Sequence, residues 1–153
     1  MIGAGRNLHT EVERKTRFLM AGIVPGKTAG ESVGAQLAMS SPLPAGARVG
    51  VTHDNGTGFA RHTRLRDELG MDTYFADPYS SWQRGSNENG NGIIRRYLPK
   101  RSEIRMDMAG GLREIVDEAD NRPMRVLGYR TPAEAFADEL LELQDQQGCC
   151  TSK

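Results

Sequence analysis

The chain has 153 residues, of which 37% are hydrophobic and 26% are charged, and its formal net charge at pH 7 is zero. These values are typical of a soluble globular protein with one domain and a sizeable core. They exclude a membrane-spanning protein, because no apolar run approaches the ~20 residues that a transmembrane helix needs, and they give no overall attraction to nucleic acid. We therefore expect a cytoplasmic protein.

The first half of the chain alternates strand patterns with helix patterns. Four short runs bounded by turn residues predict strands, at residues 8–13, 17–24, 48–52 and 72–76. The link at residues 14–16 joins the first two strands as a hairpin. Thr28 and Glu31 form a capping-box pattern that begins one helix, and Gly70 ends a second helix over residues 59–69.

The second half is predicted to be helical. One helix carries Glu88, a second covers residues 112–119, and a third begins at Thr131, where proline and then glutamate follow at favourable positions. The order of the elements indicates an α/β domain with a mixed sheet flanked by helices. We assign residues 1–137 to one core domain and residues 138–153 to a helix end with a disordered tail.

Two acidic residues stand out as candidate catalytic residues. Asp54 closes the strand predicted to start at residue 48, and it precedes an Asn-Gly pair. Asp-Asn-Gly is common in turns, so a turn residue is the simpler interpretation of Asp54 taken alone. Functional residues also gather in loops that follow strands, which makes a catalytic role the alternative. The second acid is Glu88, and 33 residues separate the two.

The helix that carries Glu88 has a polar face and a face of small or apolar residues. At about 100° per residue, three polar residues fall within ~60° of Glu88, namely Arg84, Asn91 and Arg95. The opposite face holds Ser86, Gly90, Ile93 and Tyr97. Asparagine and glycine are frequent here although they form helices poorly, which indicates that they make contacts or close approaches. A solvated helix face is the alternative for the local excess of basic residues.

Several longer motifs, taken in order, resemble the transposases of the IS-thirty insertion-sequence family. The central motif is SSWQRGSNENGNGIIRRYLPK at residues 80–100, with FADPYSSW before it and NRPMRVLGYRTPAEAF after it. Two upstream segments also match the family, VERKTRFL at residues 12–19 and THDNGTGFARH at residues 52–62. The 33-residue separation of Asp54 and Glu88 is the spacing of the family. The resemblance covers nearly the whole chain.

This resemblance implies a fold and a chemistry. The family consists of DDE-type enzymes with an integrase-like, ribonuclease-H-like catalytic core. Three carboxylates hold two Mg²⁺ or Mn²⁺ ions, which support cleavage and joining of DNA strands. Asp54 and Glu88 would be catalytic residues and metal ligands, as the second and third acids. The resemblance implies DNA contacts for Arg84, Asn91, Arg95, Arg96, Lys100 and Arg101.

The resemblance also implies partners and a location. The DNA partners are the ends of the mobile element and the target DNA. The protein partners are further copies of this chain, as a homo-oligomer, or a full-length transposase, and no membrane partner is expected. The chain would act in the cytoplasm in association with the nucleoid.

The chain departs from the family pattern near its beginning. In the family the first acid stands in a Gly-Asp-Leu segment just before the stretch that matches residues 2–5, so we expect the first catalytic Asp and most of its strand to be missing. Glu11 or Glu13 is a poor substitute, and Gly58 stands where the family usually has glutamate. We expect a transposase core fragment that is inactive alone. The alternatives are a non-catalytic remnant that binds DNA or a transposase, and a decayed copy without function.

Overall fold

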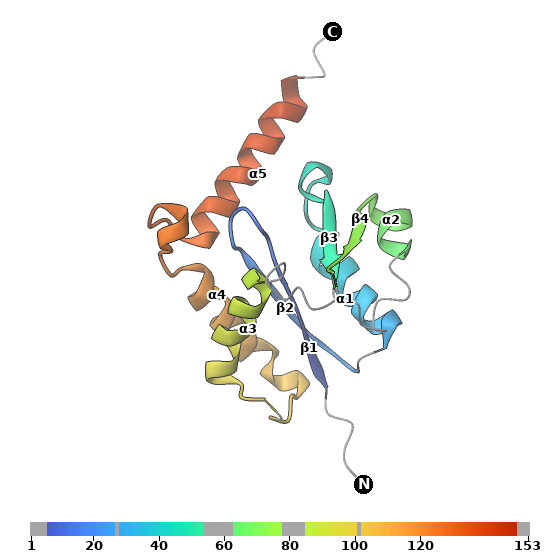
Figure 1. The fold of residues 1–153 in the computed structure, drawn as a ribbon, viewed down its shortest axis with the longest axis vertical. Coiled ribbons are helices and arrows are strands. Elements are labelled where there is room, and N and C mark those ends of the chain that lie inside the picture. The colour runs from blue at the N-terminus through green and yellow to red at the C-terminus, as the bar shows by residue number, and fades with distance from the viewer. Residues whose placement is uncertain (1–5, 27, 54–62, 78–84, 101, 150–153) are drawn as a thin grey trace.

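The computed structural model describes residues 6–26, 28–53, 63–77, 85–100 and 102–149, which form an α/β arrangement (Figure 1). The strands in this part of the chain are β1 (Asn7–Val12), β2 (Leu19–Val24), β3 (Gly50–His53) and β4 (Asp72–Phe75). The α-helices are α1 (Ala29–Ser40), α2 (Thr63–Leu69), α3 (Gly85–Tyr97), α4 (Ala109–Asp120) and α5 (Pro132–Cys149). Short 3₁₀ helices lie at Ala45–Ala47, Met106–Met108 and Arg125–Leu127.

The predicted hairpin is confirmed. β1 and β2 pair in antiparallel fashion, with Asn7 opposite Val24 and Val12 opposite Leu19. β2 begins at Leu19 rather than at residue 17, because Arg17 has a φ of 64°. A residue in this left-handed region turns the chain and cannot continue a strand.

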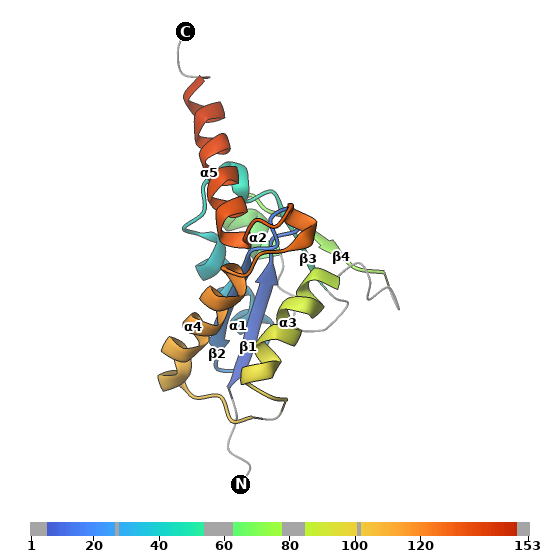
Figure 2. The same cartoon turned by 90° about the vertical axis from the view of Figure 1, so that its left-hand side faces the viewer.

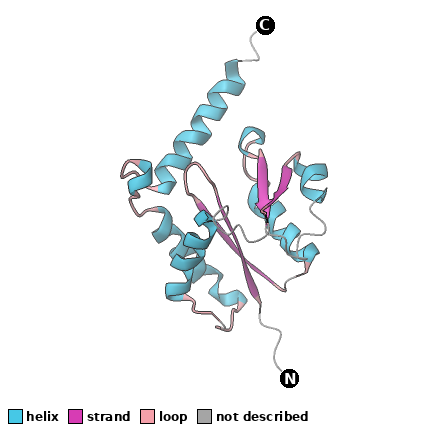
Figure 3. Ribbon diagram, viewed as in Figure 1, coloured by secondary structure: helices cyan, strands magenta, loops and turns pink. Residues whose placement is uncertain are grey.

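The other two strands form a parallel pair. Gly50 lies opposite Asp72, and α2 lies in the crossover that joins β3 to β4, as parallel neighbours require. Gly70 ends α2 as predicted, with a φ of 68° and its N–H donating to the Arg66 carbonyl at 3.0 Å. Within the described residues the two pairs are separate sheets (Figure 3). This arrangement differs from the single mixed sheet that the sequence predicts.

Two helices begin with the predicted capping boxes. At α1 the N–H of Glu31 donates to Thr28 Oγ1 at 3.3 Å, and the N–H of Thr28 donates to the Glu31 carboxylate at 3.1 Å. At α5 the corresponding distances between Glu134 and Thr131 are 3.2 Å and 3.0 Å. These reciprocal bonds satisfy amide groups that the start of a helix leaves without intrahelical partners.

Helix α5 joins the rest of the molecule through its first turns. Phe136 stacks on Phe18 of the hairpin link, with ring centroids 4.3 Å apart and planes inclined by 7°, and Glu139 pairs with Lys15. The later turns of α5 project away from the other elements (Figure 2). The helix continues to Cys149, and residues 150–153 lie outside the described part of the chain.

Apolar side chains gather in two separate clusters. The larger cluster lies between the hairpin, α3 and α4, where Leu19 is 3% exposed and Ile94 is 2% exposed. The smaller cluster lies between α1, α2 and β3 and is centred on Val33 and Leu65, which are fully buried. Among the described helices, none combines the length and apolar character that crossing a membrane requires.

Candidate functional site

The structure describes only some of the residues that the sequence assigns to a site. Glu88, Asn91, Arg95, Arg96 and Lys100 lie in described regions. The remaining candidates lie outside them, namely Asp54, Arg84 and Arg101. The roles of these three residues therefore stay predictions.

The residues directly before each of the two predicted acids border one cleft. Its volume is about 270 Å³. Thr52 and His53, which directly precede Asp54, line this cleft together with Ser86 and Asn87 from the first turn of α3. The fold thus brings the end of β3 and the start of α3, which are far apart in the sequence, to the same cleft. Glu88 itself is not among the lining residues and Asp54 lies outside the described residues, so a joint role of the two acids stays a prediction.

Glu88 lies in the first turn of α3 and is exposed. The neighbouring asparagines hold this turn of the helix against β1. Thr10 Oγ1 donates to Asn91 Oδ1 at 2.6 Å and lies 3.4 Å from Asn87 Oδ1, and Ser86 Oγ accepts a hydrogen bond from the Arg17 guanidinium. The predicted DNA-contacting residue Asn91 therefore also anchors the helix, because its side-chain oxygen is committed to the hairpin.

Gly90 lets α3 approach the hairpin closely. A Cβ atom at this position would lie 3.0 Å from Leu19 Cδ1 and 3.0 Å from Val12 Cγ2, which is tighter than ordinary packing. Ile94, one turn later, is buried. The predicted small and apolar face of the helix thus packs on the hairpin, although Tyr97 at its end is 46% exposed and donates through its hydroxyl to Glu118 at 2.7 Å.

Three of the predicted DNA-contacting cations are exposed along the end of α3 and just beyond it. Arg95 and Arg96 lie in the last turn of the helix, and Lys100 follows it. No salt bridge to another described residue engages any of the three. Their charges are therefore available to an anionic ligand. Arg95 and Arg96 lie on the same helix as Glu88, and Lys100 follows the end of that helix.

Both acids considered as substitutes for a first catalytic Asp have local partners. Glu11 Oε1 lies 3.2 Å from His9 Nε2. The Glu13 carboxylate accepts from Thr16 Oγ1 at 2.6 Å and from the N–H groups of Thr16 and Lys15 at 2.5 Å and 3.0 Å. Burial alone would raise the pKa of Glu13, but these hydrogen bonds outweigh it and hold the pKa below its ordinary value. Glu13 therefore stabilises the hairpin turn.

The described residues alone do not assemble a metal centre. Among them, no group of three or more His, Cys, Asp or Glu side chains is placed to hold a metal ion. Glu88 supplies an exposed carboxylate oxygen, which is the donor type that hard divalent cations prefer. The second predicted ligand, Asp54, follows His53 at the cleft but lies outside the described residues.

The sequence interpretation missed a buried polar pair at the cleft. Gln36 on α1 and His53 on β3 are each 2% exposed, and Gln36 Nε2 lies 3.4 Å from His53 Nδ1. Gln36 Oε1 has no hydrogen-bond partner among the described residues. The signal in the sequence was the position of Gln36 three residues after Val33, on the buried side of the predicted helix.

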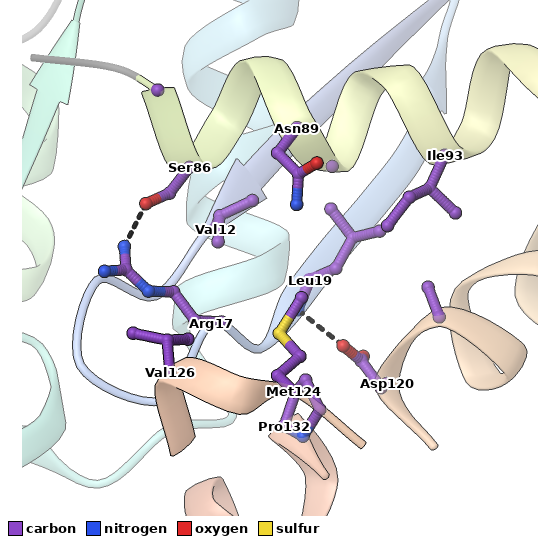
Figure 4. A pocket seen from close by; sticks show the side chains of 13 residues that line it. Val12, Arg17, Leu19, Ser86, Asn89, Ile93, Asp120, Met124, Val126 and Pro132 are labelled. Atoms are coloured by element: carbon purple, nitrogen blue, oxygen red, sulfur yellow. Dashed lines mark hydrogen bonds between the residues drawn. The ribbon is translucent and has the colours of Figure 1, made fainter. Parts of the chain in front are cut away.

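A second cavity, of about 300 Å³, lies on the other side of α3 between the hairpin, α4 and the start of α5 (Figure 4). Most of the side chains around it are apolar, including Leu19 and Ile93. The Asp120 carboxylate, which is 3% exposed, accepts the N–H of Leu19 at 3.0 Å. Burial raises the pKa of Asp120 to about 6. Val12 and Ser86 line both this cavity and the cleft that Thr52 borders.

The chain is similar in sequence to curated transposases, whereas no protein-family model matches it. It is 34% identical over 135 residues to the transposase for insertion sequence element IS1086 of Cupriavidus metallidurans, a match that covers 88% of this chain and 40% of the relative. It is 35% identical over 139 residues to transposase InsI for IS30A of Escherichia coli, covering 88% and 36%. The transposase for IS4351 of Bacteroides fragilis is 43% identical over 86 residues, covering 56% and 26%.

Solved structures establish the fold. The catalytic core domain of BIV integrase superposes with a TM-score of 0.67 at 19% identity, over 93% of this chain and 90% of that one. A chain of the simian T-cell lymphotropic virus intasome gives a TM-score of 0.68 at 20% identity, over 85% and 48%. The chain therefore has the ribonuclease-H-like fold of integrase catalytic cores, as predicted.

Proposed function

Because this chain is homologous to insertion-sequence transposases over most of its length, we propose that it is a transposase catalytic-core fragment whose chemistry is DNA strand cleavage and strand transfer. The chain spans about two fifths of the curated relatives that it matches. One structural observation supports the proposal independently of homology. Thr52 and His53, which directly precede Asp54, border the same cleft as Ser86 and Asn87, which directly precede Glu88.

In this proposal Asp54 and Glu88 are catalytic residues that hold divalent cations, Mg²⁺ or Mn²⁺. Carboxylate oxygens suit these hard ions. Two ions in such a site activate the attacking oxygen and stabilise the leaving oxygen of a phosphodiester. Asn87 and Asn91 fix the turn that carries Glu88 against β1, so they position its carboxylate relative to the end of β3.

The proposed DNA contacts extend along α3 from Glu88. Exposed Arg95, Arg96 and Lys100 would bind backbone phosphates, with Arg84 and Arg101 at the two ends of the same stretch. Asn91 would contribute through its amide nitrogen, because its oxygen accepts from Thr10. The proposed partners are element ends and target DNA, and either further copies of this chain or a full-length transposase.

Metal binding tests the assignment of the two acids. Mn²⁺ added to the isotope-labelled chain should broaden the amide signals of Thr52, His53 and Asn87 before those of other residues. Asp54→Asn or Glu88→Gln should each raise the Mn²⁺ concentration needed by about tenfold, because each removes one charged oxygen ligand. Asp67→Asn, at an exposed position of α2, is the matched control. Unchanged broadening in both acid variants would contradict the site.

The second candidate function is DNA binding without cleavage. The exposed cations at the end of α3 favour it, because they do not depend on a complete catalytic site. A non-specific duplex should bind at low salt and be released as salt rises, because phosphate contacts displace counterions. Arg95→Ala should lower the slope of log affinity against log salt by roughly one. Arg113→Ala, at an exposed position of α4, should leave the slope unchanged. Equal slopes for both variants would remove Arg95 from the interface.

A further inference from the structure

The cavity between the hairpin, α3, α4 and the start of α5 lies beside the proposed site but has no role in it. Its volume is about 300 Å³, at the lower end of the ~300–1,000 Å³ that is usual for small-ligand pockets. Ser86, in the first turn of α3, lines the cavity two residues before Glu88. The lining also includes the exposed residues Asn89 and Val126, so a ligand can enter from solvent. Such a ligand would be small and would lie next to the helical turn that carries Glu88.

The walls of the cavity are mainly apolar (Figure 4). Leu19 comes from β2 and Ile93 from α3, whereas Met124 and Pro132 come from the connection to α5 and from its first residue. Apolar side chains from different elements suit the two faces of a flat ring, as in pockets that hold a nucleobase. The polarizable sulfur of Met124 favours contact with an aromatic ring. The cavity is therefore suited to a flat aromatic ligand.

The cavity also contains a buried carboxylate. Asp120 lines the cavity and is 3% exposed. Its Oδ1 accepts the N–H of Leu19 at 3.0 Å, and no other described residue donates a hydrogen bond to this carboxylate. Burying a charge that is incompletely hydrogen-bonded is costly. A ligand whose donors reach Asp120 would offset this cost.

The hydrogen-bonding pattern of the nucleobases makes guanine the best partner for this carboxylate. A carboxylate pairs most strongly with two parallel N–H donors. Guanine presents two adjacent donors, its N1–H and N2–H groups, on one edge, whereas adenine, cytosine and thymine place an acceptor next to the donor. Each carboxylate oxygen can accept two hydrogen bonds, so the bond from Leu19 leaves both oxygens of Asp120 able to accept.

A positive charge lies at the other end of the cavity. Arg17 is half-buried and lines the cavity, and its guanidinium donates to Ser86 Oγ. Among the described residues, no carboxylate forms a salt bridge with Arg17. A guanidinium has five N–H donors in a fork that fits phosphate, so donors remain for an anion. Figure 4 shows Arg17 and Asp120 on opposite sides of Leu19. This order of cation, apolar wall and acceptor matches the order of phosphate, sugar and base in a nucleotide.

We propose that this cavity binds one guanine nucleotide of the DNA substrate, with its base turned out of the double helix. The base lies between the apolar walls and donates through N1–H and N2–H to Asp120, and its phosphate contacts Arg17. Contacts in the cavity replace the pairing and stacking that the base loses. The inference rests on the proposed function for the DNA as ligand, and it adds recognition of one base beside the turn that carries Glu88.

Binding of single nucleotides to the intact chain tests which ligand the cavity takes. The probes are the 5′-monophosphates of deoxyguanosine, deoxyinosine, deoxyadenosine, deoxycytidine and thymidine, each without metal ions. Deoxyguanosine monophosphate should shift the amide NMR signals of Leu19, Ile93 and Met124. It should bind about tenfold more tightly than the others, because deoxyinosine lacks the N2 donor and the other three lack the donor pair. Equal binding of all five, or shifts confined to Arg95 and Arg96, would contradict the proposal.

A substitution in α4 separates the assigned contact from stability. Asp120→Asn keeps an oxygen for the Leu19 N–H but loses the paired acceptors. Affinity for deoxyguanosine monophosphate should therefore fall about tenfold, while the thermal midpoint at pH 7 is unchanged or higher. Asp117→Asn, at an exposed position of the same helix, removes the same charge and should leave the affinity unchanged. Equal losses in the two variants, or no loss in Asp120→Asn, would overturn the contact.

A substitution in the hairpin link tests the phosphate end. Arg17→Gln removes the charge, so affinity for deoxyguanosine monophosphate should fall about tenfold, to that of the nucleoside deoxyguanosine. The affinity for the nucleoside itself should not change. Arg14→Gln, at an exposed position of the same link, is the control and should change neither affinity. A loss that is equal for nucleoside and nucleotide would refute the phosphate contact.

Duplex DNA with one unpaired guanosine shows whether the nucleotide belongs to DNA or is free in solution. The control duplex has an abasic site at the same position. The chain should bind the first duplex about tenfold more tightly, and Asp120→Asn should remove this preference. Equal binding of the two duplexes would overturn the proposal, even where the free nucleotide binds. The proposed function can still hold in that case, because the Mn²⁺ test and the salt dependence of duplex binding do not involve this cavity.

Discussion

The two sides of the cleft differ in how completely they cover their apolar residues. On the hairpin side, Leu19 and Ile94 are nearly fully buried between β2, α3 and α4. On the other side, the side chains that pack against the smaller cluster around Leu65 are only partly buried, namely Leu37, Val51 and Leu69. Tyr74 and Phe75 of β4 are 58% and 42% exposed. We call the hairpin side the closed side because Leu19 and Ile94 are buried there, although a cavity of about 300 Å³ adjoins Leu19. We call the β3–β4 side the open side because Tyr74 and Phe75 are partly exposed.

The two sides also carry different parts of the proposed site. The hairpin side presents Glu88 on a helix that Gly90 and Ile94 fix in place. The other side carries His53, whose C-terminal neighbour is the predicted ligand Asp54. The closed side therefore supports Glu88 on a packed helix, and the open side carries the residue that directly precedes the predicted ligand Asp54.

The largest expected effects come from truncating one buried side chain in each apolar cluster. Leu65→Ala and Leu19→Ala should each lower the free energy of unfolding by about 2–5 kcal/mol, because both side chains are buried. The location of the damage should differ. Leu65→Ala should speed amide exchange in β3 and β4 and leave the hairpin protected, as measured by exchange followed residue by residue.

The reverse variant supplies the control for this comparison. Leu19→Ala should speed exchange on both sides, because the smaller cluster also contacts the hairpin through α1. If Leu65→Ala speeds exchange of the hairpin as much as that of β3, the two sides unfold as one cooperative unit. The contrast between a closed side and an open side would then be wrong.

A substitution in α3 tests how tightly the closed side is packed. Gly90→Leu should lower the free energy of unfolding by about 1–3 kcal/mol, because its side chain would meet Leu19 and Val12. Gly92→Leu is the matched control in the same helix, where a Cβ meets nothing within 4 Å, and higher helix propensity should make it neutral or stabilising. Chemical denaturation measures both. Equal effects of the two variants would refute close packing at Gly90.

Features governed by local chemistry could be predicted from the sequence. The capping pairs at Thr28 and Thr131 and the left-handed Gly70 depend on residues within one turn, so short patterns suffice to find them. The resemblance to transposases adds the fold, because long motifs in a fixed order fix the order of strands and helices. Glu88 lies on a helix as predicted.

Features governed by distant contacts could not be predicted. The hydrogen bond from Leu19 to Asp120 spans 101 positions, and the contact of Gln36 with His53 joins a helix to a strand. Asn91 illustrates the same limit, because its helical position is correct but its oxygen bonds to Thr10 rather than facing solvent. Helical periodicity gives the side of a helix on which a residue lies, but the partner on that side depends on tertiary packing.

The remaining prediction concerns pH and the closed side. Burial raises the pKa of Asp120 to about 6 from 3.8, so the folded chain holds this proton more tightly than the unfolded chain. The stabilising contribution is full below about pH 4 and is lost as pH rises through 6. Asp120→Asn cannot ionise, so its stability relative to the parent should improve by about 2 kcal/mol between pH 4 and pH 7, as measured by denaturation at each pH. Because an asparagine oxygen can still accept the Leu19 N–H, a constant difference across this range would mean that the Asp120 carboxylate is solvated, and the hairpin side would then be less closed than its burial indicates.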